Sequence, residues 1–194
     1  MVYDEIAKNR RKSFILLILF SIFTVFICYF IGSAWFGSGL GGLIFGFVIS
    51  LTMSLVSFYT GDKVVLSSVG AKEINRSENP LLYNVTEELC IAAGIPVPKI
   101  YIVPDPSPNA FATGRNLENA KIAVNEGLLK ILNREELQGV IAHELSHIKN
   151  NDIMFATIVS VLLGMIIILS TVFRRTFWWS GRDRDREGGG VILV

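Results

Sequence analysis

The sequence VIAHELSH at residues 140–147 holds both histidines of the 194-residue chain, His143 and His147. On an α-helix, residues i and i+4 lie on one face about 6 Å apart, so two imidazole nitrogens spaced in this way can bind one tetrahedral Zn²⁺ ion. Glu144 projects about 100° around the helix from His143, where its carboxylate can accept a proton from a metal-activated water without binding the metal. The spacing therefore predicts a zinc site with two histidine ligands and Glu144 as the catalytic base.

The residues around this motif predict a helix over residues 134–149. Asn133 precedes the helix as an N-cap, and Glu136 follows three residues later. The apolar residues that continue at helical spacing are Leu137, Val140, Ile141, Ala142, Leu145 and Ile148. Because most neighbours of the motif are apolar, we expect a largely buried helix, in which imidazoles without a partner would be costly. The alternative is an exposed helical face on which both histidines and Glu144 are solvated.

Apolar residues make up 51% of the chain and are concentrated in three segments, at residues 14–36, 40–60 and 153–173. Each segment runs for about twenty residues without a charge, which is enough for a helix to cross a hydrocarbon core of about 30 Å. The sequence therefore predicts a multi-pass membrane protein. The third segment has an alternative interpretation as a buried or re-entrant helix.

Basic residues at the start of the first apolar segment predict the orientation of the chain in the bilayer. These residues are Lys8, Arg10, Arg11 and Lys12, while the short turn at residues 37–39 carries no charge. The positive-inside rule places the N-terminus in the cytoplasm, and the second crossing returns the chain there, so residues 61–152 face the cytoplasm. If the third segment crosses the membrane, the arginines that follow it lie outside the cytoplasm, against the positive-inside rule. The interpretation of the third segment as a re-entrant helix therefore stays open.

The remaining composition gives no support to other classes of function. Cys28 lies in the first apolar segment and Cys90 in the polar region, so no disulfide is predicted. The net charge of +1 gives no indication of a nucleic-acid partner, because the basic residues mark the ends of the apolar segments. A transporter component is disfavoured, since none of the three segments contains an ionisable residue.

The polar region between the second and third segments predicts an α+β unit. Asn79 and Pro80 begin a helix that ends near Ala93, before Gly94. Strands are predicted at residues 99–103 and 120–124, with a third candidate at 109–114, and residues 126–132 form a helical turn before the motif helix. A region of about ninety residues can hold a small core.

The segment NAFATG at residues 109–114, followed by the motif at 140–147 between a double-span N-terminus and an apolar hairpin, resembles the HtpX-like membrane zinc metalloproteases. The resemblance spans essentially the whole chain. It implies a membrane-anchored, zincin-like metalloprotease with one zinc ion per chain, in which His143 and His147 bind the metal and Glu144 is the base. The family's Asn-Ala-Phe segment is an edge strand beside the cleft, so Asn109, Ala110 and Phe111 are expected to pair with an extended peptide substrate. Without the resemblance, residues 109–114 would be an ordinary turn and strand.

The third zinc ligand of that family, a downstream glutamate, has no counterpart in the sequence. Asp152 lies five positions past His147, about 140° around and about 7.5 Å along a continuing helix, so it cannot easily complete a tetrahedron. Asp183, Asp185 and Glu187 belong to a loop expected across the membrane. Residues 191–194 resemble the start of a fourth apolar span. We therefore expect the N-terminal portion of a longer protein, with an acidic third ligand beyond residue 194.

The sequence thus divides into four expected parts. Residues 1–60 hold a basic segment and two transmembrane helices, and residues 61–152 hold the cytoplasmic part of the metalloprotease domain. Residues 153–173 form the third transmembrane or re-entrant helix, and residues 174–194 form a polar loop and the start of the fourth span.

The resemblance implies a zinc endopeptidase of the prokaryotic inner membrane. Its active site faces the cytoplasm, its partners are the lipid bilayer and peptide or membrane-protein substrates, and it serves quality control of misfolded or damaged membrane proteins under stress. The alternative is a membrane-anchored metal-binding protein without hydrolytic activity, which would need both histidines but not Glu144.

Overall fold

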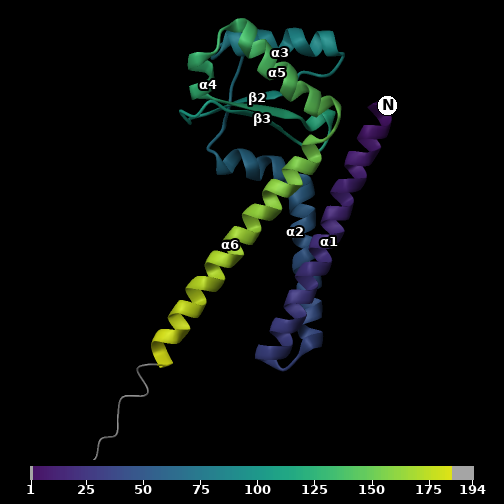
Figure 1. Cartoon of the computed structure of the whole chain (residues 1–194), viewed down its shortest axis with the longest axis vertical. Coiled ribbons are helices and arrows are strands. Elements are labelled where there is room, and N and C mark those ends of the chain that lie inside the picture. Colours follow the sequence, from purple (N-terminus) through teal and green to yellow (C-terminus); the bar gives the residue numbers. More distant parts are fainter. Residues whose placement is uncertain (1, 185–194) are drawn as a thin grey trace, which may run out of the picture.

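The structure is a computed structural model that describes residues 2–184 (Figure 1). In Figure 1, three long helices lie below one α+β unit: α1 (Val2–Phe36), α2 (Gly39–Ser68) and α6 (Ile153–Arg184). Figure 1 shows α1 and α2 side by side as a hairpin, whereas α6 leaves the α+β unit next to α2 and then diverges from the hairpin. The predicted α+β fold with an N-terminal helical hairpin is confirmed.

Helices α1 and α2 have the length and composition of membrane-spanning helices. The candidate spans are Ile6–Ser33, with a mean hydropathy of 2.9, and Gly39–Ser68, with a mean hydropathy of 2.0. Large apolar side chains such as Ile22, Phe26 and Phe45 are at least 60% exposed on their surfaces. A surface of this kind is stable in lipid rather than in water, which indicates a membrane protein.

Small residues on one face of α2 allow the long helices to pack closely. Gly42, Gly46, Ser57 and Gly61 are buried on this face. A Cβ atom at Gly42 would collide with the backbone of Cys28 in α1, and one at Gly61 would lie 3.0 Å from Cγ2 of Thr157 in α6. Close backbone approach through small residues is typical of helix packing in membranes.

The sheet has four strands in the order β1-β2-β4-β3. Strand β2 (Lys99–Val103) pairs in parallel with β4 (Lys121–Asn125), and β4 pairs antiparallel with β3 (Ala110–Thr113). The two-residue strand β1 (Lys72–Glu73) pairs antiparallel with β2. The predicted strands are confirmed, although β4 begins one residue later than expected because Ala120 ends the short helix η1 (Leu117–Asn119).

Three helices complete the α+β unit: α3 (Pro80–Ala93), α4 (Glu126–Ile131) and α5 (Arg134–Lys149). Figure 1 shows α3 and α5 on one side of the sheet and the end of α2 on the other. The fully buried residues of the main core, which lies between the sheet and α3 and α5, include Leu82, Val85, Ile100, Ile122, Leu137, Ile141 and Ile148. The motif helix is thus fixed to the sheet through its apolar face.

Two long helices continue past their predicted apolar segments. Helix α2 extends to Ser68 instead of ending near residue 60, because Asp62 and Lys63 end the apolar segment without breaking the helix. The polar loop predicted from residue 174 is wrong for residues 174–184, which are helical. The helix continues because arginine and aromatic residues are compatible with a helical conformation. The first glycine after residue 173 is Gly181. The fourth span predicted at residues 191–194 lies outside the described residues, and membrane crossing by α6 stays a prediction.

Candidate metal centre

The motif helix α5 begins at a complete capping box, as predicted. The Asn133 side chain accepts a hydrogen bond from the Glu136 amide at 3.0 Å, and the Glu136 carboxylate accepts one from the Asn133 amide at 2.9 Å. This arrangement satisfies two amides that the first turn leaves unpaired. It fixes where the helix starts, and hence which of its faces packs on the sheet.

The two histidines approach each other closely on α5. Their Nε2 atoms are 3.2 Å apart, and their ring planes are inclined at 84°. Two ligands at 2.0–2.1 Å from a tetrahedral Zn²⁺ ion would be about 3.3 Å apart, so the observed separation fits a shared zinc ion. His143 is exposed and His147 is half-buried. The expectation that both imidazoles are buried, and therefore need a binding partner, is wrong. The separation of the two Nε2 atoms is compatible with a shared metal ion, and it also allows a hydrogen bond between the two rings.

Asp152 orients His147. Helix α5 ends at Lys149, and Asn151 then adopts a left-handed conformation with φ of 55°, which turns the chain back toward the helix. The Asp152 carboxylate lies 2.9 Å from Nδ1 of His147. Because a carboxylate only accepts hydrogen bonds, Nδ1 donates the proton, and Nε2 keeps its lone pair on the side of His143.

The position of Asp152 corrects the geometry assumed from the sequence, in which the helix continued past it. Asp152 contacts the nitrogen of His147 that does not face His143, so the conclusion that it is not a third ligand stands. Its positioning role was missed, and the only signal was an acidic residue shortly after the motif, next to two asparagines that favour a turn.

Glu144 lies on the sheet side of α5 and is only 8% exposed. Burial raises the pKa of its carboxyl, while the charges of His147 and His143 and a hydrogen bond from the Ala112 amide oppose the rise. A carboxyl with a raised pKa exchanges protons more readily near neutral pH, which suits a general base.

The free edge of β3 faces the motif helix. The Asn125 amide in β4 donates to the Asn109 carbonyl at 2.9 Å, so residues 109, 111 and 113 direct their backbone groups toward β4. By alternation, the backbone groups of Ala110 and Ala112 point to the open edge. Helix α5 packs against β3, and the backbone of Ala112 is one of the groups that oppose the rise in the pKa of Glu144, so that edge lies beside the proposed base.

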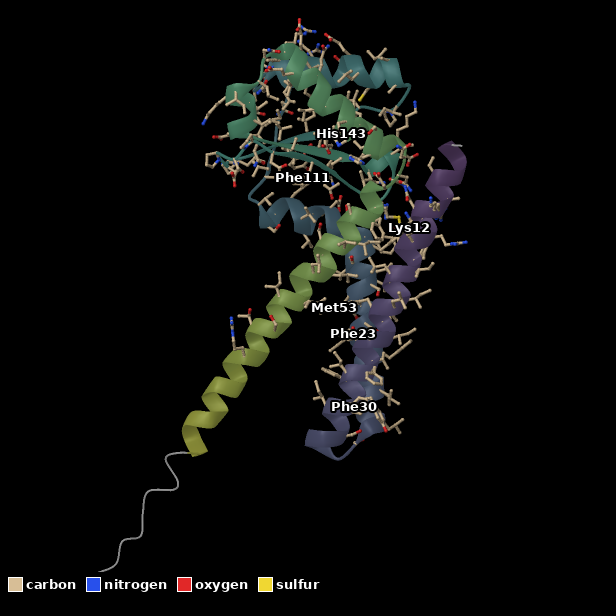
Figure 2. All side chains as sticks on the ribbon, viewed as in Figure 1. Lys12, Phe23, Phe30, Met53, Phe111 and His143 are labelled. Carbon is tan, nitrogen blue, oxygen red and sulfur yellow. The ribbon has the colours of Figure 1, made fainter. Side chains whose placement is uncertain are left out.

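The side chain of Phe111 lies away from the histidines. It packs with Leu66, Val103 and Ala123 between the sheet and the end of α2. Figure 2 shows Phe111 and His143 on opposite sides of the sheet. Of the three predicted substrate-binding residues, Phe111 therefore presents neither its side chain nor its backbone groups to the open edge, whereas Asn109 and Ala110 lie at the start of that edge, with the backbone groups of Ala110 facing it.

A third metal ligand is not found in the part of the chain that the structure describes. Within it, no group of three or more His, Cys, Asp or Glu residues is arranged to hold a metal ion. The donor set is chemically suited to zinc but provides two of the three protein ligands that catalytic zinc sites usually have.

The family assignment agrees with this fold and motif. A model of peptidase family M48 matches residues 76–193, so the chain belongs to peptidase family M48. A protein named Protease HtpX homolog from Dictyoglomus turgidum is 45% identical over 192 residues, which are 99% of this chain and 63% of that protein. One of the same name from Streptococcus gordonii is 42% identical over 198 residues, which are 100% of this chain and 67% of that protein.

The chain therefore spans about two thirds of the length of these relatives. Among solved structures, the crystal structure of Ste24p from S. mikatae matches 87% of this chain and 39% of its own, with a TM-score of 0.45 and 20% identity.

Proposed function

We propose that this chain carries the catalytic motif of a membrane-bound zinc endopeptidase. His143 and His147 are the proposed metal ligands, Glu144 the catalytic base, and a downstream acidic residue the third ligand. The observation that carries the proposal is the 3.2 Å separation of the two Nε2 atoms, with the tautomer of His147 set by Asp152. Membership of family M48 supports the same reaction class.

In this reaction the protein residues position groups and move protons. A zinc ion held by the histidines would act as a Lewis acid on the scissile carbonyl and lower the pKa of water. Glu144 accepts a proton from the attacking water and donates it to the leaving amine. In this proposal the backbone of Ala112, which opposes the rise in the pKa of Glu144, helps to orient the carboxylate for both transfers.

The substrate in this proposal is an extended peptide that adds to the open edge of β3. Backbone groups of Ala110 point to that edge, and backbone pairing makes little demand on sequence. A binding mode that accepts many different substrate sequences suits the degradation of misfolded or damaged membrane proteins. Within the predicted set Asn109, Ala110 and Phe111, the backbone of Ala110 would pair with the substrate, while Asn109 and Phe111 pair with β4 and hold that edge in place.

The proposed orientation places the active site on the cytoplasmic side of the membrane. Figure 2 shows Lys12 near the end of the hairpin closest to the sheet, with Phe23, Met53 and Phe30 farther from it. Basic residues at this end favour its cytoplasmic placement. Residues 61–152 would then form the cytoplasmic part of the protease domain, between the hairpin and a third spanning or re-entrant helix over residues 153–173.

The test uses a chimera in which this chain replaces the matching part of the Dictyoglomus turgidum relative. Zinc content and casein cleavage are measured for the chimera and for its Glu144→Gln variant, with Glu135→Gln as a control on the exposed part of the same helix. We expect Glu144→Gln to keep zinc and lose cleavage by at least a hundredfold, and the control to keep both. Cleavage that persists in Glu144→Gln would reject the base, and a zinc-loaded chimera that never cleaves would favour a metal-binding protein.

A further inference from the structure

A polar cavity lies on the opposite side of the sheet from the histidines, beside the end of α2 (Figure 1). It has a volume of about 240 Å³ and is enclosed by the end of α2, the connection between β3 and β4, and the start of α6. Its charged lining residues are Asp62, Lys63, Arg115 and Lys121, and none of the motif residues lines it. The cavity is therefore separate from the proposed metal centre.

The charges on the cavity wall leave an excess of two cations. Asp62 pairs with Lys121, and their side chains are only 13% and 11% exposed, so these two charges compensate each other. Lys63 and Arg115 take part in no ion pair among the side chains that the structure describes. The Arg115 guanidinium instead lies 5.4 Å from the centroid of the Tyr59 ring. An anion in the cavity would meet two uncompensated positive charges.

The cavity wall also carries a hydroxyl group without a partner. Ser57 is 1% exposed, and its Oγ is the one buried side-chain polar atom without a hydrogen bond among the described residues. Leaving a buried hydroxyl unpaired is unfavourable, whereas a small rotation toward an acceptor in the cavity would satisfy it. An anion with several oxygen atoms offers such an acceptor.

The cavity lies where α2 leaves its apolar segment. Residues 40–60 carry no charge, and Asp62 and Lys63 follow after Gly61. Phe58 and Tyr59 line the cavity at this transition, and aromatic residues are enriched at the level of lipid headgroups. Basic pockets between helices at this level are suited to anionic headgroups.

We propose that this cavity binds a phosphate group, carried by an anionic phospholipid or present as free phosphate, through Lys63 and Arg115. The phosphate would lie between the end of α2 and the start of α6 and so hold the α+β unit at the bilayer surface. The site does not depend on zinc or on the protease chemistry.

The test is a calorimetric titration of the 194-residue chain in neutral detergent with dihexanoyl phosphatidylglycerol, dihexanoyl phosphatidylcholine or inorganic phosphate. We expect phosphatidylglycerol to bind at least tenfold more tightly than phosphatidylcholine. The double variant Lys63→Gln, Arg115→Gln should weaken that binding by at least tenfold. Removing two exposed charges elsewhere, by Lys72→Gln and Lys130→Gln, should leave it unchanged. Binding of inorganic phosphate with equal affinity would identify free phosphate as the source, and much weaker binding would identify the lipid.

Two results would overturn the proposal. One is equal binding of phosphatidylglycerol and phosphatidylcholine together with no binding of inorganic phosphate. The other is a loss of affinity in the control variant as large as that in the cavity variant, which would indicate attraction by overall charge. Circular dichroism of all variants checks that each remains folded, and competition of phosphatidylglycerol binding by inorganic phosphate in the unmodified chain tests the site without any substitution.

Discussion

Asp152 determines which nitrogen of His147 is available for a metal. Its carboxylate lies 2.9 Å from Nδ1, and the neighbouring Asn151 makes the left-handed turn that brings it there. Carboxylates in this position fix the orientation of a histidine ligand and make it more basic. His143 has no such contact among the described side chains, so the two proposed ligands are supported unequally.

We predict that Asp152→Ala weakens zinc binding by about tenfold to a hundredfold, because the His147 ring can then rotate and lose its preferred tautomer. Asp152→Asn should weaken it less, because the amide oxygen can still accept the proton of Nδ1. Competition with a zinc-chelating dye measures both affinities in the chimera. Equal affinities for the unmodified chimera and its Asp152→Ala variant would show that the contact does not position the ligand.

The connection between α2 and the sheet depends on a buried ion pair. Asp62 near the end of α2 contacts Lys121 in β4, and both side chains are largely shielded from water. Burial lowers the pKa of Lys121, because a charged ammonium group is less stable away from water. Such a charge is tolerated only while its partner is present.

Asp62→Asn should therefore destabilise the fold by about 3 kcal/mol, because Lys121 would stay buried without a counter-charge. The double variant Asp62→Asn, Lys121→Met should recover most of this loss. Denaturant titration followed by circular dichroism in detergent measures the free energy of unfolding. A double variant that is less stable than Asp62→Asn would contradict this. It would show that the attraction between Asp62 and Lys121, and not the cost of burying an unpaired Lys121, determines the change in the free energy of unfolding.

The open edge of β3 gives a separate prediction for substrate binding. Ala110→Pro removes the amide that points to the free edge but none that pairs with β4, and proline is tolerated at such positions. We expect KM for a casein-derived peptide to rise about fivefold to tenfold in the chimera, as expected for the loss of one backbone hydrogen bond. Ala110→Val, which keeps the amide, is the control. An unchanged KM for Ala110→Pro would place the substrate elsewhere.

At the scale of the whole molecule, the features predicted from the sequence are those set by local chemistry. Each of these features depends on residues within a few helical turns of one another. They are the capping box at Asn133, the spacing of His143 and His147, and the apolar segments of α1 and α2. The turn at Asn151 was missed because its positive φ depends on how the helix ends. The pairing of Asp62 with Lys121 was missed because the two residues are 59 positions apart and meet only in the folded chain.

The arrangement of the elements explains how one short motif relates to a membrane. Helix α5 is held by its apolar face on the sheet, β3 presents its free edge beside Glu144, and α6 begins four residues after α5 ends, at Ile153. The proposed site is therefore close to the start of an apolar helix.

Zinc-edge X-ray absorption spectroscopy of the chimera tests the central claim most directly. We predict scattering from two imidazole nitrogens at about 2.0–2.1 Å, lost when both His143 and His147 are replaced by alanine and unchanged in Glu144→Gln. Imidazole scattering that survives the double histidine substitution, or a first coordination shell that changes in Glu144→Gln, would contradict the assignment of the histidines as ligands and Glu144 as the base.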